Sequence, residues 1–205
     1  MSHRPRCGSR PASTACEGGA SLVELLLVLS CIGVLASLAT PATAQSIDAG
    51  RARDASGFVA ARMRLARQHA VFRTASVALV FDRVAGRWLT RVCVDGNGNG
   101  LRRSEINDGT DRCPEGPYDL AQMFPGVDIE VDPGLRGPAG EPGSADPVRF
   151  GASDMASFSP EGTATAGTLF LRSPRGQQFA VRVGNITGRT RILRYDPGAR
   201  SWRAG

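Results

Sequence analysis

The pattern of apolar and polar positions divides the first third of the chain in two. Residues 20–44 are apolar or small and carry a single charge, Glu24, and as a helix they would extend roughly 37 Å, enough to cross a bilayer. Beyond them, apolar or small residues recur at three- and four-residue spacing, at Ala55, Val59, Met63, Ala66 and Ala70. The pattern predicts one helix from about residue 21 to 72, half in lipid and half packed on a globular part.

From Ser76 onward the period becomes that of β-strands. Residues 77–81 and 88–94 are β-rich and flank Val84-Ala85-Gly86, which predicts a hairpin. Further short strands are expected at 127–131, 148–150, 168–172, 179–183 and 190–195, and an exposed Gly/Pro-rich loop at 133–147. The predicted fold class is α+β, in which a long N-terminal helix, membrane-spanning in its first half, packs against a C-terminal antiparallel β head.

The residues before and around Glu24 resemble a processing site. Gly18-Gly19-Ala20-Ser21-Leu22-Val23-Glu24 is similar to the N-terminus of type IV pilins and pseudopilins, in which a prepilin peptidase cuts after a glycine and the fifth mature residue is glutamate. The resemblance implies cleavage between Gly19 and Ala20. It also implies that Glu24 pairs with the terminal amine of a neighbouring subunit during filament assembly. Ala20 departs from the methylated phenylalanine that is usual in this family.

The resemblance predicts four segments: a prepilin leader at 1–19, a transmembrane half-helix at 20–44, its periplasmic continuation at 45–74 and a β head at 75–205. The protein would then be a single-pass inner-membrane protein with a periplasmic C-terminal head. The alternative is an ordinary secretory signal, which would release a soluble protein. Its parts would be the basic residues Arg4, Arg6 and Arg10, the apolar core Leu25–Ala39 and the cleavage site Ala42-Thr43-Ala44. Glu24 fits that alternative poorly.

Two of the five cysteines would face the periplasm after processing. Cys7 and Cys16 would leave with the leader and Cys31 would lie in the membrane, so Cys93 and Cys113 remain. The periplasm is oxidising, which predicts a disulfide between them. Two free buried cysteines are the alternative.

The acidic loop between these cysteines resembles part of a metal site. Asp95-Gly96-Asn97-Gly98-Asn99-Gly100 is similar to the first half of an EF-hand calcium loop, but position twelve, which requires glutamate, is Ile106. Calcium could bind in a different geometry through Asp95, Asn97, Asn99 and Glu105. Asn-Gly and Asp-Gly pairs also form turns without any metal, so the loop has a purely structural interpretation as well.

The order of the C-terminal segments resembles the GspH/FimT family of minor pilins and pseudopilins. The segments are Phe158 to Gly162, Thr168 to Leu171, Val181 to Val183, and Gly188 to Arg191. The resemblance implies a non-enzymatic subunit of a type II secretion pseudopilus or a type IV pilus. Its partners would be prepilin peptidase, other pilin subunits and the inner membrane.

The branch of that family associated with natural transformation carries a Gly-Arg-x-Arg motif implicated in DNA binding, and Gly188, Arg189 and Arg191 match it. Strand alternation would place both arginines on one face, where guanidinium groups can hold phosphate oxygens. Arg194 would point to the other face. The alternative is that the arginines pair with the acidic middle of a neighbouring subunit.

Charge is distributed unevenly along the chain. All 25 basic residues are arginine, and blocks of net charge +6 (residues 45–94) and +7 (162–205) flank an acidic block of −8 (95–161). Such asymmetry can steer a polyanion or pair the subunits of a filament. The two histidines, His3 and His69, and the remaining nucleophiles form no catalytic spacing. We therefore expect no enzymatic activity and, calcium apart, no cofactor.

Overall fold

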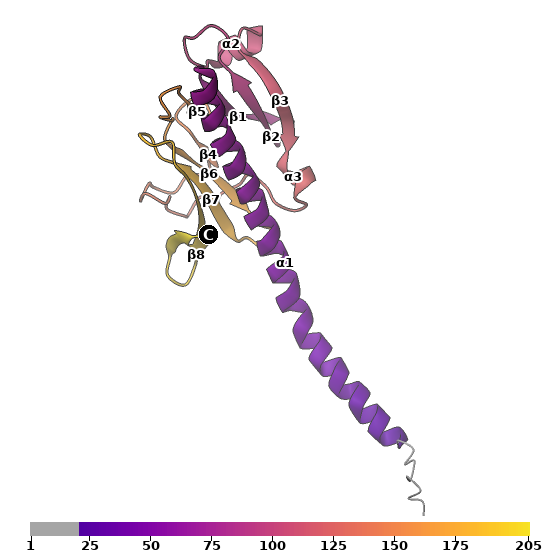
Figure 1. Cartoon of the computed structure of the whole chain (residues 1–205). Coiled ribbons are helices and arrows are strands. Elements are labelled where there is room, and N and C mark those ends of the chain that lie inside the picture. Colours follow the sequence, from indigo (N-terminus) through magenta and orange to yellow (C-terminus); the bar gives the residue numbers. More distant parts are fainter. Residues whose placement is uncertain (1–20) are drawn as a thin grey trace, which may run out of the picture. The chain divides into compact units, whose positions relative to one another are not determined.

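The computed structural model describes the backbone of residues 21–205 and the side chains of residues 21–36 and 46–205 (Figure 1). The predicted leader, with Gly19 and Ala20, lies outside these residues. The chain divides into two units, residues 1–42 and 43–205. Helix α1, Leu22–Arg73, begins in the first unit and continues into the second. Its bounds confirm the predicted helix to within one residue at each end.

In the first unit, α1 exposes its apolar side chains. Ten large hydrophobic residues between Leu22 and Leu35 are 47% to 74% exposed, and Glu24 lies in the first turn. Among the residues that the structure describes, no helix is long and apolar enough to cross a membrane. The predicted span of residues 20–44 includes Ala20 and the side chains of residues 37–44, which lie outside the described part.

In the second unit, α1 packs through the predicted apolar face. Ala55, Val59, Met63, Ala66 and Ala70 are all at most 1% exposed, which confirms the spacing argument. They join one hydrophobic cluster that also contains residues of both sheets, among them Leu79 and Phe81 from one and Leu169 and Val181 from the other. Alanines on this face let the helix backbone approach the strands closely. The hydrophobic core therefore lies between α1 and the two sheets.

Two antiparallel sheets make up the rest of this unit. The first has the strand order β3-β2-β1-β5, formed by Arg112–Asp119, Arg87–Val94, Val77–Val84 and Met155–Phe158. The second has the order β4-β6-β7-β8-β9, formed by Val148–Arg149, Gly167–Arg172, Gln178–Val183, Thr190–Asp196 and Ser201–Ala204. Two short helices, α2 (Arg103–Asp108) and α3 (Leu120–Met123), precede and follow β3. The α+β class and the antiparallel pairing are as predicted.

The β1–β2 hairpin is confirmed, with longer strands and a tighter turn than predicted. Val84 pairs directly with Arg87, which leaves Ala85 and Gly86 as a two-residue turn. Their φ values of 50° and 80° are both positive. Positive φ at both central residues is the requirement of a type I′ turn, whose twist matches that of the flanking strands.

The predicted strand at 127–131 is wrong. Its apolar residues Val127, Ile129 and Val131 are buried, but the backbone pairs with the second sheet only at Asp128, opposite Arg172. Gly126, at φ 83°, and Pro133 bound the segment closely. Burial of alternate side chains without a continuous ladder explains why the pattern resembles a strand.

Three strands that the pattern did not predict, β3, β5 and β9, are all edge strands. An edge strand pairs on one side only and tolerates polar residues and proline. Accordingly, β3 contains Pro114 and Pro117, and none of its eight residues is fully buried. Such segments lack the apolar alternation by which the central strands were recognised.

Candidate functional site

The arginine motif lies at the start of β8. Gly188 has a φ of 57°, and a Cβ there would come within 2.8 Å of the Gly162 carbonyl oxygen and of the Arg67 side chain. Only glycine fits this turn without displacing its neighbours. The turn leads into Arg189, whose carbonyl accepts a hydrogen bond from the Gly184 amide at 3.1 Å. Gly188 therefore forms the turn that positions Arg189 and Arg191 at the start of β8.

The second sheet has an inner face, packed on α1, and an outer face. Ile192 packs against the inner cluster, whereas Leu193 packs with Phe170 and Ala180 on the outer face. Alternation along β8 places Arg191 on the outer face with Leu193, and Arg189, two residues earlier, follows the same alternation. Arg194 shares the parity of Ile192. The strand thus places Arg191 and Arg194 on opposite faces, as predicted, and Arg189 directly precedes the strand.

Arg189 and Arg191 are both exposed. Within the part of the chain that the structure describes, neither guanidinium group forms an ion pair, although ten such pairs involve other arginines. An unpaired, solvated guanidinium is available to an external anion.

The outer face carries more arginine than the motif predicts. Arg191 is directly opposite Arg182 on β7, Arg182 is opposite Thr168 on β6, and Thr168 is opposite Arg149 on β4. We call these four residues, three arginines and Thr168, the arginine row. Sequence analysis missed the row because its members come from four different strands, and only the pairing of those strands brings them side by side.

One carboxylate meets the row. Glu141, from the 133–147 loop, accepts a hydrogen bond from Arg182 Nη1 at 3.2 Å and another from the Ala139 amide at 2.8 Å. Burial opposes ionisation of Glu141. This effect is outweighed by hydrogen bonds from the backbone amides of Glu141 and Ala139 and by the charges of Arg182 and Arg149. The pKa of Glu141 is therefore held below its usual range. The loop that we expected to be a plain insertion thus supplies the counter-charge of the row.

Arg149 is held in a different way. Its guanidinium donates to the carbonyl oxygens of Asp146, at 2.9 Å, and Ser144, at 3.0 Å. The group also lies 4.5 Å from the ring centroid of Phe170. These contacts fix the side chain but leave its charge without a direct carboxylate partner. The row therefore ends in a fixed arginine on β4 and an unpaired one on β8.

Cys93 and Cys113, the two cysteines expected to pair, form a disulfide with a sequence separation of 20. It closes the segment that contains the acidic loop and α2. Cys93 is fully buried beneath this segment, in a small cluster with Ala78, Val80 and Ile106. The disulfide therefore pins the loop to the first sheet.

Asp95 organises the acidic loop through its carboxylate. Its two oxygens accept hydrogen bonds from the backbone amides of Asn97 (3.1 Å), Gly98 (2.8 Å) and Gly100 (2.7 Å). Asp111, which the calcium hypothesis did not include, is 2% exposed and accepts from the amides of Gly96 and Arg102. Both carboxylates are satisfied by the backbone of the loop itself.

The other predicted calcium ligands, Asn97, Asn99 and Glu105, lie close together but are hydrogen-bonded to one another. Asn97 and Asn99 donate their side-chain amides to the Glu105 carboxylate at 3.3 Å and 2.9 Å. Among the described residues, no group of three or more His, Cys, Asp or Glu side chains is placed to hold a metal ion. To bind calcium, the two asparagines would have to present their oxygens in place of their nitrogens.

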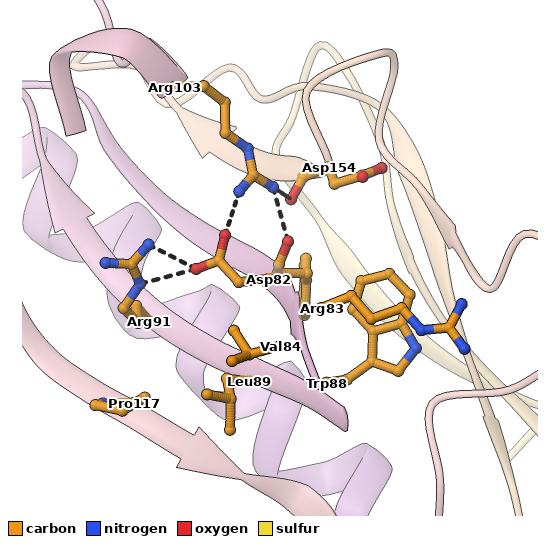
Figure 2. Close-up of a pocket in the computed structure, with 10 residues that line it drawn as sticks. Asp82, Arg83, Val84, Trp88, Leu89, Arg91, Arg103, Pro117 and Asp154 are labelled. Atoms are coloured by element: carbon orange, nitrogen blue, oxygen red, sulfur yellow. Dashed lines mark hydrogen bonds and ion pairs between the residues drawn. The ribbon is translucent and has the colours of Figure 1, made fainter. Parts of the chain in front are cut away.

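A surface pocket of about 670 Å³ lies beside the first sheet, lined mainly by the end of β1 and the start of β2 (Figure 2). Asp82 lies between two arginines: it accepts from Arg91 Nη2 at 2.6 Å and also forms an ion pair with Arg103. Arg103 further donates to the carbonyl oxygens of Phe81 (2.7 Å) and Ser153 (2.8 Å). These bonds join α2 to β1 and to the segment before β5.

The charges of Asp82, Arg91 and Arg103 in this pocket are directed at each other, whereas Arg83 lies over the Trp88 ring. Figure 2 shows the guanidinium groups of Arg91 and Arg103 turned toward Asp82. Burial, and secondarily the charge of Asp146, raises the pKa of Asp154 at the rim. Because Arg91 and Arg103 already have partners, the pocket offers an external anion less than the outer face of the second sheet does. We therefore assign the Asp82 cluster a structural role.

Of the remaining predicted site residues, Glu24 lies in the first turn of α1, and Gly19 and Ala20 lie outside the described residues. Comparison of the chain with protein-family models, with curated proteins and with solved structures found no match.

Proposed function

We propose that the protein is a non-enzymatic minor pilin or pseudopilin of a type II secretion pseudopilus or a type IV pilus. In this account a prepilin peptidase removes residues 1–19. The first half of α1 then anchors the subunit in the inner membrane, with the β head in the periplasm. The subunit enters a filament with other pilin-type subunits.

The observation that carries this proposal is the combination of Glu24 with an uncovered apolar helix. The side chains of Leu22 to Leu35 are mostly more than half exposed, and large apolar surfaces of this kind mark contacts with lipid or with another protein. A carboxylate in such surroundings is costly unless it is paired. The terminal amine of a neighbouring subunit, which the resemblance implies as its partner, would satisfy it.

The direct test is the incorporation of Glu24 variants into filaments. We expect Glu24→Gln and Glu24→Ala to be cleaved like the wild type but incorporated at least several-fold less, because both remove the charge. Ser30→Ala, a change in the same exposed part of the helix, is the matched control and should incorporate normally. Incorporation of both Glu24 variants at the wild-type level would refute the assembly role.

A second candidate function, capture of DNA by the same subunit, is favoured by the unpaired Arg189 and Arg191. Two exposed guanidinium groups on one face can contact phosphates without regard to base sequence. Two phosphate contacts on duplex DNA correspond to a salt slope of about −1.8. Arg149, whose charge has no direct carboxylate partner, would add to the attraction at longer range.

The test of DNA capture compares the two faces of β8. We expect the double variant Arg189→Ala, Arg191→Ala to lose most DNA binding and to flatten the salt dependence. Arg194→Ala removes an exposed arginine from the opposite face and should retain most of the binding. Equal binding by the wild type and the double variant would exclude this candidate. If the double variant instead fails to assemble, the arginines contact an acidic surface of a neighbouring subunit.

A further inference from the structure

We propose that the outer face of the second sheet contains a site for an unpaired nucleobase, formed by Tyr195 and Trp202, so that the subunit prefers single-stranded over duplex DNA. The inference rests on the candidate DNA-capture function and specifies its substrate. The site consists of residues that no part of the sequence motif includes.

The two rings form a fixed aromatic platform. Tyr195 on β8 is directly opposite Trp202 on β9, and their ring centroids are 5.3 Å apart in an edge-to-face arrangement. The Trp202 ring also contacts Phe170 at 5.6 Å, and its indole N–H donates to the Arg136 carbonyl oxygen at 2.8 Å. These contacts fix the indole, although both rings remain partly exposed to solvent.

A pocket of about 570 Å³ opens beside the two rings. This volume lies within the range of small-ligand sites. The other wall is the 134–140 part of the Gly/Pro-rich loop, which contributes three glycines and Pro138. The charged residues of the described lining are Arg136 and Arg200, with no carboxylate among them. The pocket therefore combines aromatic surface with positive charge, which suits a base attached to a phosphate backbone.

The position of the pocket relative to the motif supports the same ligand. Arg191, Leu193 and Tyr195 alternate onto the outer face of β8, and Arg189 directly precedes the strand. Tyr195 lies four positions beyond Arg191 along the strand, a distance of roughly 13 Å. A few nucleotides of single-stranded DNA are long enough to cover this distance, and single-strand-binding domains typically cover ~4–16 nucleotides. A strand lying along β8 can thus place phosphates on the arginines and a base at the rings.

The preference for single-stranded DNA follows from stacking between a ring and a base. The ring of Tyr195 or Trp202 can stack only on a base whose face is free, and in a duplex each base face is covered by its neighbours. Phosphate contacts at Arg189 and Arg191 are open to both forms of DNA. The aromatic pocket therefore adds affinity for single strands alone.

The test uses Trp202 as its own reporter, in the full chain held in detergent micelles. Trp88 and Trp202 are the two tryptophans of the chain, and Trp88 lines the pocket over the first sheet. In a Trp88→Phe background, an oligothymidine should quench the fluorescence of Trp202. A duplex of equal length at equal occupancy should not. Tyr195→Ala should weaken oligothymidine binding at least fivefold and leave duplex binding unchanged, whereas Tyr195→Phe should resemble the wild type.

The outcomes separate this inference from the function on which it rests. If both forms of DNA bind equally, Trp202 is not quenched, and only the Arg189→Ala, Arg191→Ala variant loses binding, the base site is refuted and DNA capture stands. If neither form binds at low salt, both proposals are refuted. An unchanged melting temperature of Tyr195→Ala shows that a loss of affinity does not come from unfolding.

Discussion

Arg182 and Arg191 lie directly opposite each other on β7 and β8, yet only Arg182 is paired with a carboxylate. Like charges at directly opposed positions of a sheet repel each other. Glu141 relieves this repulsion by neutralising Arg182 and leaves Arg191 available. A residue of the 133–147 loop therefore controls how much positive charge the outer face presents to an anion.

Removing the Glu141 charge should strengthen DNA binding. In Glu141→Gln, Arg182 is free to contact a phosphate, so we expect an affinity about two- to fivefold higher at low salt and a salt slope steeper by about 0.9. The measurement is a DNA titration across a salt series. Asp108→Asn changes the net charge equally but lies at the end of α2, beside the first sheet, and it should leave affinity nearly unchanged. An equal rise in both variants would show that net charge alone is responsible.

The same carboxylate should make stability depend on pH. The pKa of Glu141 is lowered in the folded state from an ordinary value of 4.5. Its contribution to the free energy of unfolding is therefore fully present above pH 4.5 and is lost as the pH falls through the lowered pKa. The difference in melting temperature between the wild type and Glu141→Gln should be constant near neutral pH and shrink below pH 4.5. A difference that grows with acidity would contradict the assigned direction.

Asp95 should stabilise the acidic loop whether or not calcium is present. Asp95→Ala removes the acceptor of three backbone N–H bonds, so we expect a loss of about 2 kcal/mol in the free energy of unfolding. Urea denaturation with chelator and with millimolar calcium measures it. Asp108→Ala, which removes one exposed acceptor at the end of α2, should lower the free energy of unfolding much less. A loss that occurs only in calcium would instead identify Asp95 as a metal ligand.

The β1–β2 turn should accept a stabilising substitution. Ala85 adopts a φ of 50°, which is unfavourable for alanine but common for asparagine at the first central position of a type I′ turn. Ala85→Asn should raise the free energy of unfolding by about 0.5–1 kcal/mol and the melting temperature accordingly. A lower melting temperature would indicate that the turn is of another type.

Local spacing was sufficient to predict the helix and the central strands. Ala55, Val59 and Met63 repeat at helical spacing because a single face of α1 meets both sheets, and this relation is visible within a few residues. The same kind of reasoning failed at 127–131, where alternate burial arises without strand pairing. The edge strands were missed for the opposite reason: β3 is paired but has no apolar alternation.

The candidate site was predictable only as far as it is local. Gly188, Arg189 and Arg191 are contiguous in the chain, so a motif could identify them. The contact between Glu141 and Arg182 joins residues 41 positions apart, and that between Trp202 and Arg136 joins residues 66 apart. No pattern within one segment encodes these pairs. The aromatic pocket also required β9, an edge strand that the pattern did not predict.

The mature N-terminus tests the central claim most directly. The protein would be isolated from membranes of a cell that expresses a prepilin peptidase, and its first residue determined by mass spectrometry of the N-terminal peptide. The account predicts a chain that begins at Ala20, with Glu24 as its fifth residue. A chain that begins at Gln45, directly after the small-residue site Ala42-Thr43-Ala44, would show an ordinary secretory signal and contradict the assignment as a pilin subunit.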